Sequence, residues 1–347
     1  MQRRTFTRTF VAAALATAML GAAAGCSDDS DDTTSTASGS QSLEKVTYLT
    51  SFGTFGRDAY AYVAKEKGYF KDAGFDVDIK AGGGTFENLK AIVGGTAQYT
   101  PLDLTGTLLA AGAAKDPVTG FAAVAGIQQR TMAAIITLEG NEITTPKDLE
   151  GKTLADSPSS VVRNLFPTYA KLAKIDYTKV TWKNGTPASL MGILAGGQAA
   201  GIGQFVVGKP TVESITKKKA VVLPYSDYLQ DLYGNVLVTS AANAKDNPEK
   251  VKKFTAALLK GLQDSIANPT EAGTILKKYV PTAIPEAAGA ELTLMGPFVR
   301  SEASGVPVGA LDSQRVARSI AILQGSGQIA AGLTPEKVID FSLVPKA

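Results

Sequence analysis

Small polar and aromatic side chains are concentrated in the ten residues SFGTFGRDAY, which begin at Ser51. Ser51 and Thr54 offer hydroxyl groups, Phe52 and Phe55 offer flat apolar faces, and Asp58 adds a carboxylate. Such a set can hold a small flat molecule through hydrogen bonds and ring contacts. The alternative is that the two rings pack beneath the following helix. We expect these five side chains to contact a ligand.

Two further turns combine a strand end with a helix start. Gly84 and Thr85 end the run GGGT, and a glycine-rich turn at a helix N-terminus suits an anion or a carbonyl oxygen. Asp103 and Thr105 follow the next apolar run. Asp103 either caps the helix that begins near Thr105 or accepts a hydrogen bond from a ligand amino group. All four residues are expected at the ligand site.

The second half of the chain supplies a similar set of groups. The hydroxyl-rich segment DSPSS follows one apolar run and precedes a helical one, so its hydroxyls either cap that helix or face a ligand. A single tryptophan either stacks on a ligand ring or belongs to the core. The side chains expected to contact the ligand here are Ser157, Ser159, Ser160, Trp182, Gln204 and Phe205.

The composition excludes several kinds of chemistry. The chain of 347 residues has no histidine and one cysteine, Cys26, which removes serine–histidine and cysteine–histidine nucleophiles and histidine metal sites. We therefore expect no catalytic residue, no metal and no cofactor. The three arginines of the first 25 residues account for the formal net charge of +3, and the rest of the chain holds 32 basic and 32 acidic residues. This balance argues against a nucleic-acid partner.

The N-terminus resembles an export signal. Residues 1–26 hold a basic segment, an apolar run too short to span a membrane, and small residues before Cys26. Arg3-Arg4 is similar to a twin-arginine signal, and the general secretory route is the alternative. The end, AAGC, resembles a lipobox with alanine in place of the usual leucine, which predicts lipidation of Cys26. The alternative is an ordinary cleaved signal. Residues 27–42 are polar and are expected to form a disordered tether.

The rest of the chain predicts an α/β fold. Apolar strand-like runs, from Val46–Thr50 to Asn235–Thr239, alternate with helix-like segments, and helical segments follow Asn247. Leu89–Gln98 and Leu190–Ala199 share one pattern, an amphipathic helix stopped by glycines before an apolar run. This repetition indicates two lobes of similar plan.

The run YVAKEKGYFKDAGFDV, Tyr62–Val77, resembles a signature of ABC-transporter solute-binding proteins. The branch is the one for nitrate, sulfonates, taurine and thiamine-pyrimidine precursors. Leu104–Gly106, Lys147–Lys152 and Gly197–Ile202 are also similar to that family. The resemblance implies a type II periplasmic-binding-protein fold, with two lobes joined by two crossings and a ligand cleft between them. The implied lobes are residues 43–138 plus 236–347, and residues 139–235.

The implied function is that of the extracytoplasmic solute-binding component of an ABC importer. It would bind a small heteroaromatic, pyrimidine-like solute, or one of the sulfonate or nitrate type, and deliver it to permease subunits. A lipid anchor would hold the chain, expected to be a monomer, on the outer face of the cytoplasmic membrane. The alternatives are a sensor lipoprotein on the same fold and a pyrimidine-synthesising enzyme, although the latter's histidine is absent from this chain.

Overall fold

The computed structural model describes residues 42–301 and 305–346. The predicted signal, the tether up to residue 41 and Cys26 lie outside the described residues. Among the described residues, the buried hydrophobic core runs from Val46 to Val344, and residues 41–347 form one compact unit with its own core. Within the described part of the chain, no helix is both long and apolar enough to cross a membrane.

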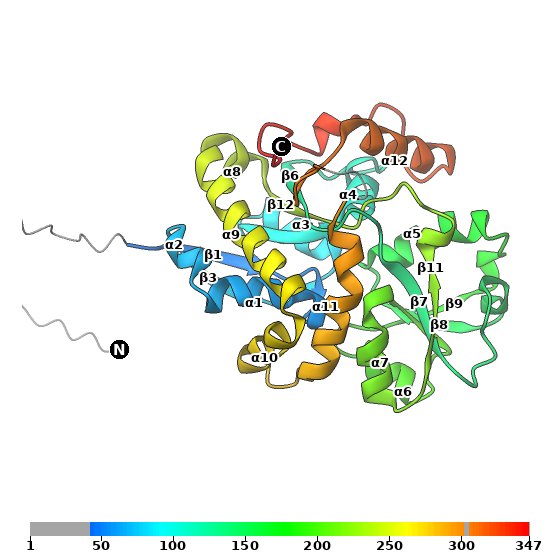
Figure 1. The fold of residues 1–347 in the computed structure, drawn as a ribbon. Helices are drawn as coiled ribbons and strands as arrows, with labels where there is room; N and C mark the ends of the chain where they lie inside the picture. The colour runs from blue at the N-terminus through cyan, green and yellow to red at the C-terminus, as the bar shows by residue number, and fades with distance from the viewer. Residues whose placement is uncertain (1–41, 302–304, 347) are drawn as a thin grey trace, which may run out of the picture. The chain divides into compact units, whose positions relative to one another are not determined.

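The first lobe is built on a five-stranded sheet in the order β3-β1-β5-β12-β6 (Figure 1). Its strands are β1 Glu44–Leu49, β3 Phe75–Lys80, β5 Tyr99–Asp103, β6 Phe121–Gly126 and β12 Asn235–Ser240. β12 runs antiparallel to both neighbours, so Asn235 lies opposite Asp103. The reason is that β12 enters the sheet from the second lobe, at the edge where β5 ends.

The second lobe has its own five-stranded sheet, in the order β11-β7-β10-β8-β9. Its strands are β7 Ala133–Leu138, β8 Thr153–Asp156, β9 Thr181–Asn184, β10 Gly201–Phe205 and β11 Ala220–Pro224. The sequence-based division after residue 138 was wrong, because β7 pairs with β10 and β11. An all-apolar strand of this kind suits either sheet, so its composition does not fix the boundary. The two crossings lie at residues 127–132 and 225–234.

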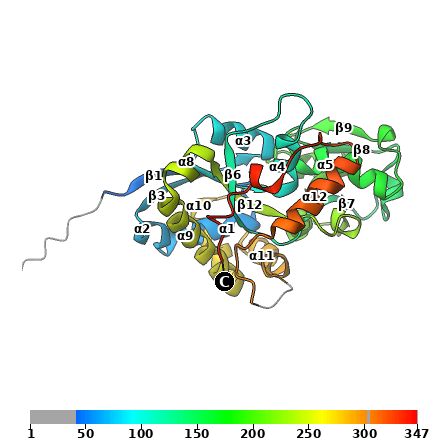
Figure 2. The ribbon, with the colours of Figure 1, turned by 90° about the horizontal axis from the view of Figure 1, so that it is seen from above.

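Helices cover both sheets, and the last four belong to the C-terminal part of the chain (Figures 1 and 2). They are α1 Ala59–Glu66, α2 Tyr69–Asp72, α3 Thr85–Val93, α4 Leu104–Ala111, α5 Val161–Leu172, α6 Leu190–Ala195, α7 Lys209–Thr216, α8 Ala241–Asp246, α9 Pro248–Ala267, α10 Pro269–Tyr279, α11 Pro285–Val299 and α12 Ser313–Gly325. Two short strands, β2 Phe52–Gly53 and β4 Gly82–Gly83, pair with each other beside the first sheet.

Helix α9 anchors the core of the first lobe. It begins with Pro248 at its first turn, a favourable position because proline lacks the N–H that a first-turn residue leaves unbonded. Phe254 on this helix stacks on Tyr99 at a centroid distance of 3.8 Å and on Phe70 at 5.0 Å. Aromatic pairs of this kind add stability beyond their buried area.

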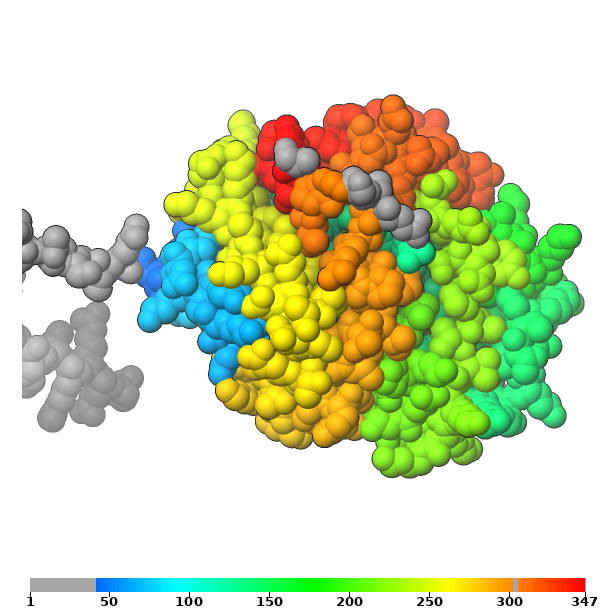
Figure 3. All heavy atoms as spheres, in the orientation of Figure 1, coloured from blue at the N-terminus to red at the C-terminus, as the bar shows by residue number. Residues whose placement is uncertain are grey.

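Helix α11 packs against α9 and α10 on the first lobe. It also contacts α7 of the second lobe. Its Ala288 packs on Gly56, where an added Cβ would lie 2.4 Å from the Ala288 Cα. About one turn further along the helix, the Thr211 hydroxyl of α7 donates a hydrogen bond to Glu291. In the space-filling view, the surface of α11 lies between those of α9 and of the second lobe (Figure 3). The C-terminal part of the chain therefore links the two lobes.

Candidate functional site

Many of the predicted ligand contacts meet in one small cavity between the lobes. The cavity is lined by Ser51, Phe52, Gly84, Thr85, Asp103, Ser160, Val161, Phe205 and Asn235. These residues lie where β1, β3, β5, β8 and β10 end, the edge at which α/β sheets bind ligands. We refer to it as the inner cavity. It encloses about 10 Å³, which is room for about one water molecule.

Direct contacts between the lobes keep the inner cavity small. The Ser159 hydroxyl of the second lobe donates to the Gly83 carbonyl of the first at 2.6 Å. The rings of Phe52 and Phe205 meet edge to face, with centroids 6.3 Å apart. Gly84 has a φ of +111°, and a Cβ there would lie 2.9 Å from the Ser159 carbonyl oxygen. The structure therefore has the lobes closed on each other.

Asp103 and Ser160 cap helices while they line the inner cavity. Asp103 Oδ1 accepts from the Thr105 backbone N–H at 2.9 Å, and its Oδ2 accepts from the Thr131 hydroxyl at 3.4 Å. Ser160 Oγ accepts from the Val162 N–H at 3.2 Å. Ser157 is buried, and its hydroxyl shares a hydrogen bond of 2.9 Å with the Ser159 hydroxyl.

Several buried polar atoms near this edge have no hydrogen-bond partner among the described residues. They include Ser51 Oγ, Thr105 Oγ1, Asp156 Oδ2, Gln204 Nε2, and the Nε and Nη1 of Arg57. Buried polar groups are nearly always paired, so each such atom calls for an explanation. Among these residues, Ser51 lines the inner cavity, where a polar ligand would supply a partner for its hydroxyl, whereas the others lie outside the cavity lining.

Arg57 is the residue that the sequence reasoning missed at this edge. Its side chain is buried, and its Cζ lies 4.6 Å from the Phe55 ring centroid and 4.7 Å from that of Phe205. Its Nη2 donates to the Phe52 carbonyl at 3.0 Å, and its backbone N–H donates to Glu291 Oε2 at 3.0 Å. The sequence signal that could have identified Arg57 is its position as the single arginine in a glycine-rich, largely apolar loop.

Asp58, Trp182, Thr54 and Phe55 are four predicted contacts that lie away from the inner cavity. Asp58 is buried and its Oδ2 accepts from the Phe55 N–H at 3.0 Å, so it holds the turn that precedes α1. Trp182 packs edge to face on Phe166, with centroids 5.3 Å apart, on the second lobe. Thr54 and Phe55 border a separate and larger space.

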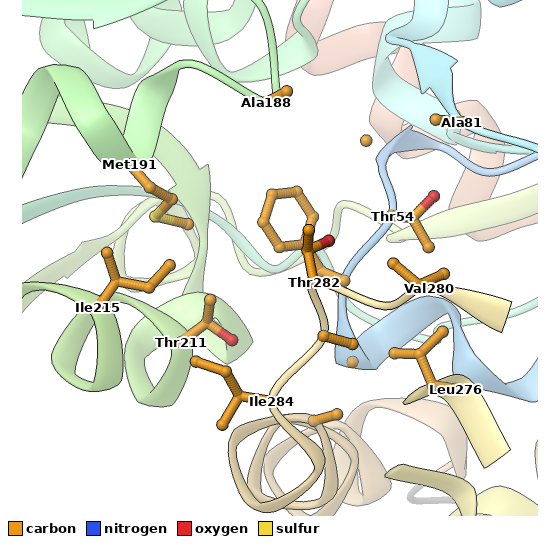
Figure 4. Close-up of a pocket in the computed structure, with 15 residues that line it drawn as sticks. Thr54, Ala81, Ala188, Met191, Thr211, Ile215, Leu276, Val280, Thr282 and Ile284 are labelled. Atoms are coloured by element: carbon orange, nitrogen blue, oxygen red, sulfur yellow. The ribbon is translucent and has the colours of Figure 1, made fainter. Parts of the chain in front are cut away.

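That larger space, which we call the outer pocket, has a volume of about 480 Å³ (Figure 4). The first-lobe loop, helices α6 and α7 of the second lobe, and the connection between α10 and α11 all contribute to it. Its lining is Gly53, Thr54, Phe55, Gly56, Ala81, Ala188, Met191, Thr211, Ile215, Leu276, Val280, Thr282, Ala283, Ile284 and Ala288. Apart from Thr54 and Phe55, none of these residues was predicted from the sequence to contact a ligand. Their separation along the chain hides their proximity.

Four buried carboxyl groups surround the closed interface. Burial raises the pKa of Asp58 and of Asp103 to about 6. Burial also raises the pKa of Asp156 and of Glu291 to about 7. The Arg57 guanidinium acts in the opposite direction on the pKa of Asp58 and of Glu291. Burial in a poorly polar interior disfavours the charged form of a carboxyl group.

The sequence profile of the NMT1/THI5-like family matches residues 58–272. The chain belongs to this family. The matched span begins in the loop after β1 and includes all the strands of the second lobe and the crossings on either side of it. Both lobes of this NMT1/THI5-like chain thus contribute to the match, as the Tyr62–Val77 signature led us to expect.

Two curated proteins resemble this NMT1/THI5-like chain in sequence. It is 25% identical over 245 residues to the formylaminopyrimidine-binding protein of Halalkalibacterium halodurans, covering 70% of this chain and 73% of that protein. A shorter stretch of 123 residues is 30% identical to the riboflavin-binding protein RibY of Chloroflexus aurantiacus, covering 33% of this chain and 34% of that protein.

Solved structures confirm the predicted fold. The alkanesulfonate-binding protein SsuA from Xanthomonas axonopodis pv. citri, bound to MOPS, aligns with a TM-score of 0.67 at 16% identity, over 88% of this chain and 99% of that one. The periplasmic nitrate-binding protein NrtA from Synechocystis PCC 6803 aligns with a TM-score of 0.68 at 11% identity, over 87% of each chain. This NMT1/THI5-like chain therefore has the periplasmic-binding-protein fold.

Proposed function

We propose that this protein is the extracytoplasmic solute-binding component of an ABC importer. The observation that carries the proposal is the inner cavity, where polar and aromatic residues from both lobes meet and the buried Ser51 hydroxyl has no partner among the described residues. A solute held there would contact both lobes at once. Such a solute stabilises the closed arrangement, because it gains its full set of contacts only when the lobes meet. The names of the curated relatives, both binding proteins, support this function.

The chemistry of the inner cavity favours a solute that donates hydrogen bonds. Asp103 lines the cavity, and the buried Asp156 ends β8, four residues before the cavity-lining Ser160, so two carboxyl groups are available as acceptors. The rings of Phe52 and Phe205 would flank a flat molecule. We therefore propose an amino-substituted heteroaromatic solute ahead of a sulfonate or nitrate. The formylaminopyrimidine-binding relative supports this class.

A thermal-shift screen of residues 42–347 tests the function. The panel holds aminopyrimidines, riboflavin, alkyl sulfonates and nitrate. A solute at 100 times its dissociation constant should add about 2.7 kcal/mol to the free energy of unfolding. That gain raises the melting temperature by several degrees. The control is the same panel on Asp103→Asn, in which the helix cap is kept but the carboxylate is lost.

A solute identified by this screen can then be used in an uptake assay, which separates the importer from the sensor alternative. A hit should lose affinity in Asp103→Asn, and cells lacking the gene should take up that solute more slowly. Unchanged uptake of a confirmed ligand would favour the sensor. A cooperative melt with no shift from any solute of the panel would count against solute binding of the proposed class.

We also propose that the protein is exported and anchored through a lipid on Cys26. The proposal rests on the sequence AAGC and the polar segment that follows it. Cells grown with labelled palmitate should label the native chain and leave Cys26→Ala unlabelled, because the chain has a single cysteine. The variant should also move from the membrane fraction to the soluble exported fraction. Equal labelling of both chains would contradict the anchor.

A further inference from the structure

The closed structure has room for a solute in the outer pocket. The inner cavity holds about 10 Å³, whereas the outer pocket holds about 480 Å³ in the same arrangement of the lobes. Small-molecule sites usually measure about 300–1,000 Å³. One segment of the first lobe borders both spaces, with Ser51 and Phe52 on the inner cavity and Thr54 and Phe55 on the outer pocket.

The walls of the outer pocket suit a neutral and apolar molecule. None of the described residues that line it is charged, and aliphatic side chains such as Met191, Leu276 and Ile284 form much of the surface (Figure 4). The hydroxyl of Thr211 is already engaged, since it donates to Glu291. An ion placed here would lose hydration without gaining a partner of opposite charge. An apolar ring or a branched alkyl group would instead be removed from water.

The rim of the pocket leaves apolar surface exposed to water. Ile215 on α7 is 44% exposed although it faces this pocket, and Val280 and Ile284 are only half-buried. An occupant would touch the first-lobe loop, helix α7 and the α10–α11 connection together. It would therefore cover this exposed surface and stabilise the closed lobes at the same time.

We propose that the outer pocket binds a neutral, flat or branched apolar group. This assignment of the occupant rests on the proposed function. The group is then the apolar body of the transported solute. The solute is then amphipathic. Its polar end faces the inner cavity, and its apolar body lies against Met191 and Ile215. A free apolar molecule of similar size would bind the same pocket weakly.

A fluorescent neutral probe, N-phenyl-1-naphthylamine, tests the pocket in residues 42–347. Ile215→Asp places a charge in the wall, and Ala188→Trp fills the space from an exposed position. The matched controls are Leu172→Asp, at a site 46% exposed on the same lobe and away from the pocket, and Ala195→Trp at the exposed end of α6. We expect saturable binding that both pocket variants weaken at least tenfold, while both controls stay within twofold of the native protein.

Two results would overturn the assignment of the pocket. One is the absence of saturable probe binding to the native protein, and the other is equal probe affinity in the pocket variants and their controls. The solute found by the panel screen gives a second readout. If that solute binds all four variants equally, the solute does not use the outer pocket, although the proposed function stands. If the probe binds as expected and no panel solute binds, the pocket stands and the proposed function is in difficulty.

Discussion

Raising the pH from 5 to 8 is expected to lower the free energy of unfolding of residues 42–347 by roughly 2–5 kcal/mol. Asp58, Asp103, Asp156 and Glu291 have pKa values of about 6 or 7 in the folded protein. In the unfolded chain such groups titrate near 4. At pH values between the unfolded and the folded pKa values, the folded state holds protons that the unfolded state has lost. The free energy of unfolding therefore falls as the pH rises and levels off above the folded pKa values.

Urea unfolding at several pH values measures this loss. Asp156→Asn should reduce the slope between pH 5 and pH 8, because it removes one of the two carboxyl groups with a pKa of about 7. Asp148→Asn is the control. Hydrogen bonds from Thr144 and Thr145 lower the pKa of the Asp148 carboxyl to about 2, so its contribution changes below this range. A stability independent of pH from 5 to 8 would mean that these carboxyl groups are hydrated rather than enclosed.

Gly56→Ala is expected to destabilise the protein by about 2–3 kcal/mol. The added methyl group would lie 2.4 Å from the Cα and 2.7 Å from the carbonyl oxygen of Ala288, and these are backbone atoms that cannot rotate away. Helix α11 must move, which strains the hydrogen bonds that Glu291 accepts from the Arg57 N–H and the Thr211 hydroxyl. This cost exceeds the gain of at most about 1 kcal/mol from replacing a flexible glycine.

The matched control is Gly192→Ala on α6. Nothing lies within 4 Å of a Cβ placed there, and the position is helical. Alanine should therefore leave the stability unchanged or raise it by about 0.5–1 kcal/mol. Urea unfolding of both variants measures the effect of the same substitution at two sites. We expect the free energy of unfolding to fall for Gly56→Ala and not to fall for Gly192→Ala. If Gly56→Ala were as stable as the native protein, α11 would not pack on this turn.

Much of the inner cavity was predictable because its signals are local. A strand end followed by a small or acidic residue and a helix start is visible in the sequence, and parallel strands bring such corners to one edge. Asp103 and Ser160 illustrate what local reasoning leaves open. Each caps a helix and also faces the cavity, so the two readings considered for Asp103 are compatible in the structure.

The outer pocket and the lobe boundary were not predictable in this way. Ile215 and Ile284 are ordinary apolar residues of helical segments, and they become neighbours only because α11 reaches across to the second lobe. Strand β7 is apolar throughout and would suit either sheet. Its place is set by pairing with β10, a strand more than sixty residues further along the chain. Long-range pairing leaves no mark on local composition.

The order of strands in the first sheet imposes a delay on folding. β6 is buried along its whole length, yet it pairs on one side with β12 and, through Ala123, on the other side with Ile339. Both partners are made after the entire second sheet. A growing chain must therefore carry Phe121–Gly126 as an unpaired apolar strand while the second lobe is completed. An unpaired apolar strand of this kind is prone to associate with other chains. We therefore expect a chaperone that binds the unfolded chain to shield this segment.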